Sequence, residues 1–180
     1  SLEVRAFGSD RQLADALLAG EDPGVDLAIV SAPIAQELGA AGKLAPIDHA
    51  AIPNLANLFP EATTLPTDPG NALSVPYSWG TAGLCYRADL VAEAPDSWTD
   101  VLTPAPEHAG RVTLLADDRW LLVPALRTLG TSVNTTDGGD LDRARDLVVS
   151  ARDAGVGFDA TTFHTRLVDG TIAIAEAWDG

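Results

Sequence analysis

The sequence has one cysteine, Cys85, and no methionine among its 180 residues. A single cysteine excludes an internal disulfide and a thiolate cluster for a metal ion. Cys85 lies in the apolar run Leu84–Tyr86, which predicts a small buried hydrophobic residue. No apolar run approaches the roughly 18 residues that a membrane-spanning helix needs. No basic and apolar leader precedes Ser1, so we expect any secretion signal to lie outside this sequence.

Basic residues are also scarce, with 11 Lys and Arg against 26 Asp and Glu and a formal net charge of −15. This excess of negative charge argues against a nucleic acid partner and against anionic membranes. A cationic ligand suits the field better, although general acidity also serves solubility. A hydrophobic content of 46% is ample for a packed core, in one domain or in two small ones.

Recurrent catalytic motifs are absent. The sequence contains no HExxH, no Gly-x-Ser-x-Gly elbow, no phosphate-binding loop and no Gly-x-Gly-x-x-Gly. Its histidines, His49, His108 and His164, are scattered without metal-ligand spacing. Glu176 and Asp179 lie near the end of a predicted strand, which is weak evidence for acid–base chemistry. We therefore predict no enzyme, no catalytic residue, no metal site and no cofactor.

The first 42 residues follow a strand–helix–strand–helix order. Leu2–Phe7 alternates with a period of two, as a half-buried strand does, and helical spacing follows until Gly20. Val25–Val30 is almost continuously apolar, which indicates a parallel strand buried on both faces. Ser31 comes next, at the carboxyl end of that strand, where open α/β sheets bind ligands. Its hydroxyl is either a polar anchor for a ligand or an ordinary helix cap.

The stretch Asn71–Arg87 connects the first α/β pattern to the second. It contains two short β-type runs, Leu73–Tyr77 and Leu84–Tyr86, joined through Trp-Gly-Thr-Ala-Gly. Glycine adopts dihedral angles closed to other residues, so the stretch predicts a strand that leaves one sheet and enters another. The alternative is a bulge or hairpin inside a single sheet.

The crossover interpretation assigns roles to particular residues. Tyr77 and Trp79 would be exposed where two lobes face each other, and Gly80, Thr81 and Gly83 would form the hinge. In the hairpin interpretation Trp79 belongs to the core.

After residue 87 a second α/β pattern begins, with its own sheet. Helical patterns start at Asp or Ser and several end at glycine. The predicted strands are residues 110–115, 156–158 and 171–177, and the predicted helices are residues 96–102, 119–129, 140–148 and 163–169.

Several segments, taken in order, carry a resemblance. They are VDLAIVSAPIAQELGAAGKLAPID, SVPYSWGTAGLCYR, SWTDVL with GRVTLLADD, and LGTSVNTTD with GTIAIAEAWDG. In this order they resemble the extracytoplasmic solute-binding proteins of ABC transporters, and within them the spermidine/putrescine-binding type. The resemblance implies an α/β, periplasmic binding protein-like fold of type II, with two α/β lobes and a crossover hinge. It divides the chain into a partial first lobe (residues 1–78), an interlobe crossover (79–86) and a second lobe (87–180).

The same resemblance implies a site and partners. An acidic residue that contacts a ligand amine in the family matches Asp118, and an aromatic that packs along the ligand matches Trp178. The other readings are a helix cap for Asp118 and a core tryptophan for Trp178. A second acidic residue of the polyamine type is Leu121 here, which departs from the pattern. Trp79, Tyr77 and Ser31 would complete the ligand contacts.

The implied role is capture of a small cationic solute, such as putrescine or spermidine, for delivery to an ABC transporter permease. The implied location is periplasmic or extracellular, either secreted or membrane-anchored. The relatives are longer, so the chain resembles an internal piece with an incomplete first lobe, and exposed core surface would favour self-association. Two alternatives stay open: a binding protein for another organic solute, an anion or ferric iron, and a stand-alone regulatory α/β module.

Overall fold

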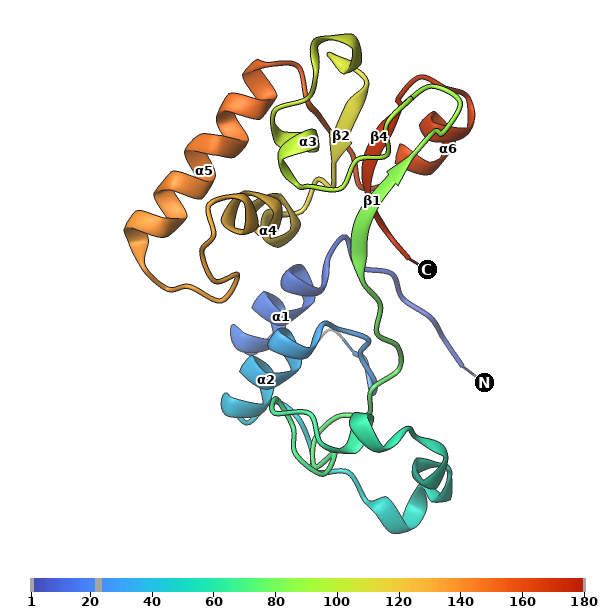
Figure 1. Cartoon of the computed structure of the whole chain (residues 1–180). Coiled ribbons are helices and arrows are strands. Elements are labelled where there is room, and N and C mark those ends of the chain that lie inside the picture. The colour runs from blue at the N-terminus through green and yellow to red at the C-terminus, as the bar shows by residue number, and fades with distance from the viewer. Residues whose placement is uncertain (1, 22–23, 180) are drawn as a thin grey trace. The chain divides into compact units, whose positions relative to one another are not determined.

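The computed structural model describes residues 2–21 and 24–179, and the chain divides into two compact units, Ser1–Trp79 and Gly80–Gly180 (Figure 1). None of the helices in these described ranges is both long enough and apolar enough to span a bilayer.

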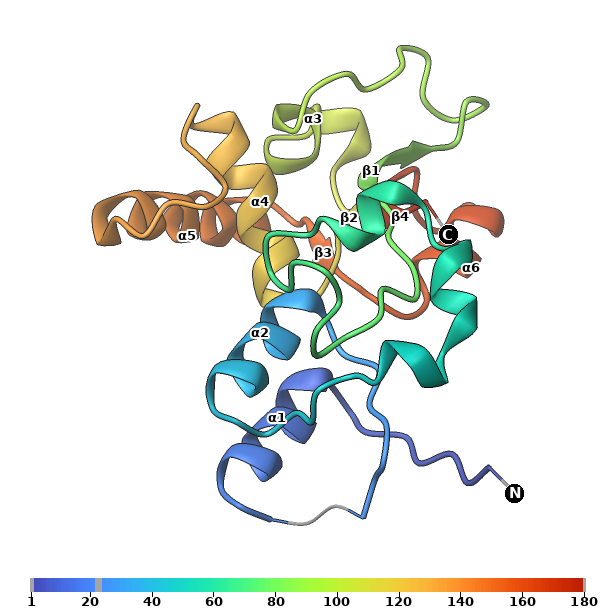
Figure 2. The ribbon, with the colours of Figure 1, turned by 90° about the horizontal axis from the view of Figure 1, so that it is seen from below.

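The second unit contains a four-stranded sheet in the order β1-β4-β2-β3. The strands are β1 (Ala82–Tyr86), β2 (Val112–Leu114), β3 (Gly157–Phe158) and β4 (Ile174–Trp178). β2 runs parallel to both β3 and β4, whereas β1 pairs antiparallel with β4. The sheet is therefore mixed, with a parallel centre and an antiparallel edge strand (Figure 2).

Helices cover both faces of this sheet. α3 (Thr99–Leu102), α4 (Asp118–Thr128) and α5 (Gly138–Asp153) lie on one side, and α6 (Phe163–Val168) lies on the other (Figure 1). The larger core includes Leu114, Leu126, Val148 and Ile174, all nearly inaccessible to water, while the α6 side has its own cluster of Leu167, Ile172 and Ala175. Burial of this apolar surface is the main stabilising contribution.

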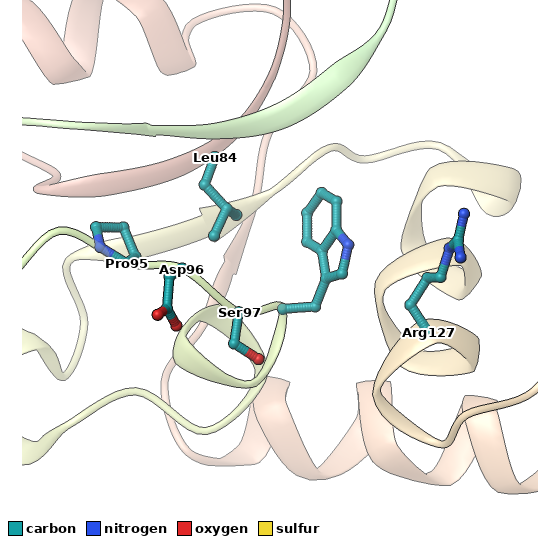
Figure 3. Close-up of a pocket in the computed structure, with 6 residues that line it drawn as sticks. Leu84, Pro95, Asp96, Ser97 and Arg127 are labelled. Atoms are coloured by element: carbon teal, nitrogen blue, oxygen red, sulfur yellow. The ribbon is translucent and has the colours of Figure 1, made fainter.

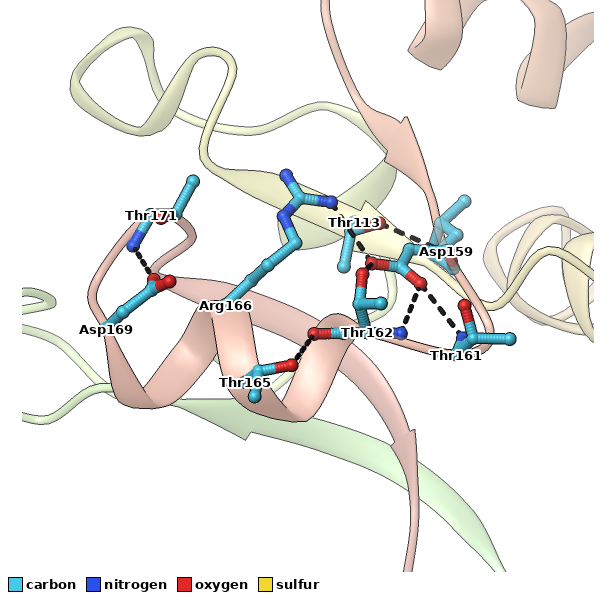
Figure 4. A network of polar contacts seen from close by, with 9 residues as sticks. Thr113, Asp159, Thr161, Thr162, Thr165, Arg166, Asp169 and Thr171 are labelled. Carbon is cyan, nitrogen blue, oxygen red and sulfur yellow. Dashed lines mark hydrogen bonds and ion pairs between the residues drawn. The ribbon is translucent and has the colours of Figure 1, made fainter.

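A buried carboxylate fixes the start of α6. Asp159 accepts hydrogen bonds from the backbone N–H groups of Thr161 and Thr162, at 2.9 and 2.7 Å, and from the Thr162 hydroxyl (Figure 4). Arg166 adds an ion pair at 3.2 Å. Burial alone would raise the pKa of Asp159, but these hydrogen bonds hold it well below the usual range. Asp159 therefore serves the fold as an ionised anchor.

The first unit is built around α1 (Asp10–Leu18) and α2 (Ala32–Ala40). Ala14, Ile34 and Leu38 form its buried apolar cluster. Short 3-10 turns follow at His49–Ala51, Pro53–Asn57 and Pro60–Thr63. The Asp68 carboxylate then ties down the returning chain, because it accepts hydrogen bonds from three consecutive backbone N–H groups, those of residues 72 to 74.

The sheet predicted for the first unit is wrong. Residues 2–7, 25–30 and 73–77 form no strand in the structure. Several of their apolar side chains stay in water, with Leu2 89% and Leu27 83% exposed. A strand requires a neighbouring backbone to pair its N–H and C=O groups, and none does so among the described residues. The first unit therefore contributes helices and irregular chain, and the sheet of the α/β fold lies in the second.

Two smaller predictions also need correction. β1 begins at Ala82, two residues before the predicted Leu84, so Gly83 lies inside a strand rather than in a loose bend. Cys85 is exposed rather than buried, because β1 is an edge strand and presents residues 83 and 85 to solvent.

Candidate functional site

The candidate site lies at one edge of the second unit's sheet. β2 and β4 are parallel neighbours, with Val112 opposite Ile174 and Thr113 opposite Ala175. Their carboxyl ends therefore meet at the same edge. The β2–α4 turn, residues 115–117, leaves there, and β4 ends there at Trp178. Ligands of open α/β sheets bind outside this edge, so the register brings the elements that carry Asp118 and Trp178 to one place.

The structure separates the roles of two adjacent aspartates at the start of α4. Asp117 is the N-cap, and its Oδ1 accepts hydrogen bonds from the backbone N–H groups of Arg119 and Trp120, at 3.0 and 3.2 Å. Asp118 is the first helical residue and is exposed, and its carboxylate has no hydrogen bond or ion pair within the described ranges. Since Asp117 provides the cap, the Asp118 carboxylate is available to an external cation.

Asp118 also borders a pocket of about 410 Å³ between α4 and α5. The wall is mostly apolar, from Leu121, Leu122, Leu141, Val148 and Val149. Asp142 and Arg145 complete the rim and pair with each other at 2.8 Å. Leu121 therefore adds apolar surface one helical turn after Asp118, where the resemblance would place a second acid. An unpaired carboxylate beside an apolar wall suits an ammonium group on an aliphatic chain.

The Trp178 side chain packs against a neighbouring ring but stays partly exposed to solvent. Its ring meets Phe163 of α6 edge to face, with 6.1 Å between centroids, and the residue remains 41% exposed. It is therefore not a wholly buried core tryptophan. A ring fixed in this way loses little side-chain entropy when a cation or a methylene chain packs against it.

Sequence reasoning missed Glu176 as a residue of this edge. The sequence marked Glu176 only as weak evidence for acid–base chemistry, whereas the structure buries it fully within β4. Its Oε2 accepts a hydrogen bond from the Leu115 backbone N–H at 3.0 Å, and Oε1 has no hydrogen-bond partner among the residues that the structure describes. Burial raises the pKa of Glu176 to about 7, and the nearby Asp117 carboxylate acts in the same direction. The sequence offered one signal for this burial. Side chains two residues apart on a strand point to the same face, so Glu176 shares a face with the apolar Ile174.

The remaining predicted contacts belong to the first unit. Tyr77 and Trp79 are 84% and 87% exposed, so Trp79 is not a core residue. The side chain of Ser31 makes no cap hydrogen bond to α2. Instead, its hydroxyl and its backbone N–H stabilise the Asp10 carboxylate, which holds the pKa of Asp10 below its usual value. A joint role of these residues with Asp118 stays a prediction.

The predicted hinge residues lie at the start of β1. Neither Gly80 nor Gly83 has a positive φ, so the glycine-only dihedral angles we expected are not used here. Thr81 is pinned to Asp179: its C=O accepts the Asp179 backbone N–H at 3.1 Å, and its hydroxyl donates to Oδ2 at 2.9 Å. Hinge motion stays a prediction, and any bend has to occur outside this pairing.

The two glycines should respond differently to alanine. A Cβ at Gly83 meets no atom within 4 Å, so Gly83→Ala should change the free energy of unfolding by less than about 0.5 kcal/mol. A Cβ at Gly80 would lie 2.5 Å from Asp179 Oδ1, so Gly80→Ala should displace that carboxylate and cost about 1 kcal/mol. Urea denaturation of the two variants measures this difference, and equal effects would contradict the packing described.

A second pocket of the same unit has a different character (Figure 3). It measures about 530 Å³ and is lined by Leu84, Pro95, Asp96, Ser97, Trp98 and Arg127. Arg127 has no ion-pair partner within the described ranges. An unpaired guanidinium in the wall disfavours an ammonium ligand, so this pocket is a poorer candidate than the edge that carries Asp118.

Residues 2–180 match the family model described as bacterial extracellular solute-binding protein. The chain is 31% identical over 186 residues to the putrescine-binding periplasmic protein PotF of Escherichia coli. This alignment covers 97% of the chain and 50% of PotF. It is 29% identical over 161 residues to the spermidine/putrescine-binding periplasmic protein of E. coli, and this alignment covers 89% of the chain and 46% of that protein. The chain therefore spans about half the length of the curated relatives it matches.

Solved structures agree with this match. The substrate-binding protein PotD of the Streptococcus pneumoniae spermidine/putrescine ABC transporter aligns with a TM-score of 0.76 at 27% identity, over 98% of this chain and 54% of that one. The Tp0655 (TpPotD) lipoprotein of Treponema pallidum gives 0.84 at 25% identity, over 94% and 53%. The chain thus has the fold of periplasmic binding proteins and belongs to the bacterial extracellular solute-binding proteins, a family of transport proteins rather than enzymes.

Proposed function

We propose that this chain forms part of a polyamine-binding site in the solute-binding component of an ABC transporter. The observation that carries the proposal is the Asp118 carboxylate, which is exposed, unpaired within the described ranges and adjacent to an apolar pocket wall. The names of the relatives, which refer to putrescine and spermidine, support the same ligand class. A diamine or triamine carries ammonium groups on a methylene chain, which is the chemistry that this surface complements.

The proposed transport role follows from the family. The ligand would be captured with help from Trp178 and, in the first unit, from Tyr77, Trp79 and Ser31, and then delivered to a permease in the membrane. The relatives are named as periplasmic proteins, so we propose a periplasmic or extracellular location for this one. No finding supports the self-association suggested by the sequence, and we do not propose it.

Calorimetric titration of the native protein in which this sequence occurs tests the proposal. Putrescine and spermidine should each be examined at low and at physiological salt. We expect saturable binding that weakens as salt rises, because the attraction includes exposed charges. Binding of an anion or of ferric iron, with no heat from either amine, would contradict the proposed ligand class.

Trp178 gives a second test. Trp178→Ala should weaken putrescine binding by roughly tenfold, because it removes the ring that packs against the methylene chain and attracts the ammonium group. Trp178→Phe is the matched variant, since it keeps an aromatic face and the edge contact with Phe163, and it should lose less affinity than the alanine variant. Equal affinity in all three proteins would exclude Trp178 from the site.

A further inference from the structure

Glu176 occupies an unusual position for a carboxylate. It lies in the middle of β4, opposite Leu84 of β1, and none of its surface is accessible to water. Among the described residues, the one hydrogen bond to its side chain comes from the Leu115 backbone N–H, which belongs to the β2–α4 turn. Oε1 is buried and has no hydrogen-bond partner within residues 2–21 and 24–179. A buried acidic group with an unsatisfied oxygen destabilises the fold, so its presence at this edge calls for a functional explanation.

In the described part of the chain, no cationic side chain pairs with this carboxylate. Asp117, in the turn, is the charged group that acts on it, and the interaction is repulsive. β1 contributes the apolar Leu84 opposite Glu176. The packed helices carry other titratable or charged side chains, but within the described ranges none of these forms an ion pair or hydrogen bond with Glu176: Asp100 on α3, Asp118, Arg119 and Arg127 on α4, and His164 and Arg166 on α6. A ligand cation at this edge would supply the compensation that these side chains do not.

We propose that Glu176 is a proton-linked positioning residue of the cation site, which holds the β2–α4 turn through Leu115 and gives up its proton when a ligand ammonium arrives. This inference rests on the proposed function. Glu176 itself does not touch the ligand. It acts through the turn that leads directly into Asp117 and Asp118, and through β4, which ends two residues later at Trp178.

The linkage follows from electrostatics. Without a ligand, burial and Asp117 favour the neutral acid, which is why the pKa of Glu176 is raised to about 7. An ammonium group beside Asp118 and Trp178 adds positive potential, which favours the carboxylate and releases one proton to solvent. The charged oxygen then accepts the Leu115 N–H more strongly, which tightens the turn around the ligand. By reciprocity, removing the proton beforehand should strengthen binding.

A titration without ligand tests the first half of this inference. The backbone amide resonance of Leu115 should shift with pH, with a midpoint near 7 in the wild type. In Glu176→Gln the side chain keeps its size and its acceptor oxygen but cannot ionise, so the shift should disappear. The three histidines are present in both proteins and cancel in the comparison. A wild-type amide with no transition near pH 7 would overturn the inference, whatever ligand binds.

Calorimetry with putrescine at pH 6 and pH 8 tests the second half. Both amines of putrescine stay protonated in this range, since primary amines titrate near pH 10. Wild-type affinity should rise by up to about tenfold at pH 8, which is the limit for displacing one proton from a group whose pKa is about 7, and Glu176→Gln should show no such rise. Buffers of different ionisation enthalpy should reveal proton release in the wild type alone.

The outcomes separate the two proposals. Normal putrescine binding with the same pH dependence in both proteins would overturn the role of Glu176 and leave the proposed function intact. A titrating Leu115 amide with no heat from putrescine or spermidine would overturn the proposed ligand and, with it, the proton-for-ammonium exchange, while it would confirm that Glu176 controls the turn.

Discussion

Asp118→Asn should weaken putrescine binding by about 10- to 100-fold, the largest effect that we expect from one substitution in the site. The change removes the negative charge but keeps the shape of the side chain. A hydrogen bond between charged groups contributes about 1.5 to 3 kcal/mol, which corresponds to this loss of affinity. The fold should tolerate the change, because Asp118 is exposed and makes no hydrogen bond or ion pair in the described part of the chain.

Asp117→Asn is the matched control. It removes the same charge one residue earlier, and asparagine is as good an N-cap as aspartate, so the hydrogen bonds to Arg119 and Trp120 should survive. We expect less than about a threefold loss from the weaker long-range attraction. Calorimetry with putrescine measures the affinity of both variants. If the two substitutions have the same effect, general negative charge rather than a specific contact attracts the ligand, and the role of Asp118 is wrong.

The second unit was largely predictable from sequence. Its apolar runs and glycine stops predicted each strand and most α-helices to within a few residues, because its patterns and its partners lie in one contiguous stretch. The exception is α5, which is capped by Asp137 and continues to Asp153, well beyond the predicted end at residue 148. The first unit was predictable in part. Its helices α1 and α2 lie where helical patterns were expected, whereas Leu2–Phe7 and Val25–Val30 carry strand patterns but find no pairing partner among the described residues. A local pattern specifies which face a strand would bury, and only a neighbouring backbone makes it a strand.

The candidate site shows the same division. The position of Asp118 at a strand-to-helix junction and of Trp178 at a strand end followed from sequence order and from the resemblance. Which aspartate caps α4 did not follow, because Asp117 and Asp118 are equally suitable caps and only the hydrogen bonds distinguish them. Glu176 was missed because acidic residues near strand ends are usually solvated. Its burial depends on the side chains of other elements that close over β4.

Asp159→Ala should lower the free energy of unfolding of the second unit by about 3 kcal/mol, the largest stability effect that we expect. The substitution leaves the N–H groups of Thr161 and Thr162 without their acceptor and leaves Arg166 without its ion pair (Figure 4). Losing one partner of a buried pair typically costs 3 to 5 kcal/mol. We take the lower end, since the Arg166 side chain keeps a relative accessibility of 33% and can be hydrated.

Asp169→Ala, at the C-cap of α6, is the matched control. Asp169 also accepts a backbone hydrogen bond, from Thr171 at 2.8 Å, but it is exposed, so the loss should stay below about 1 kcal/mol. pH gives a further check. Because the pKa of Asp159 is lowered in the folded state, its stabilisation is complete above the unfolded value near 4 and is lost as the pH falls below it. Urea denaturation at pH 7 and pH 3 should therefore show that wild type and Asp159→Ala differ less in their free energy of unfolding at pH 3. If Asp159→Ala and Asp169→Ala lose the same free energy of unfolding at pH 7, the anchoring role of Asp159 is wrong.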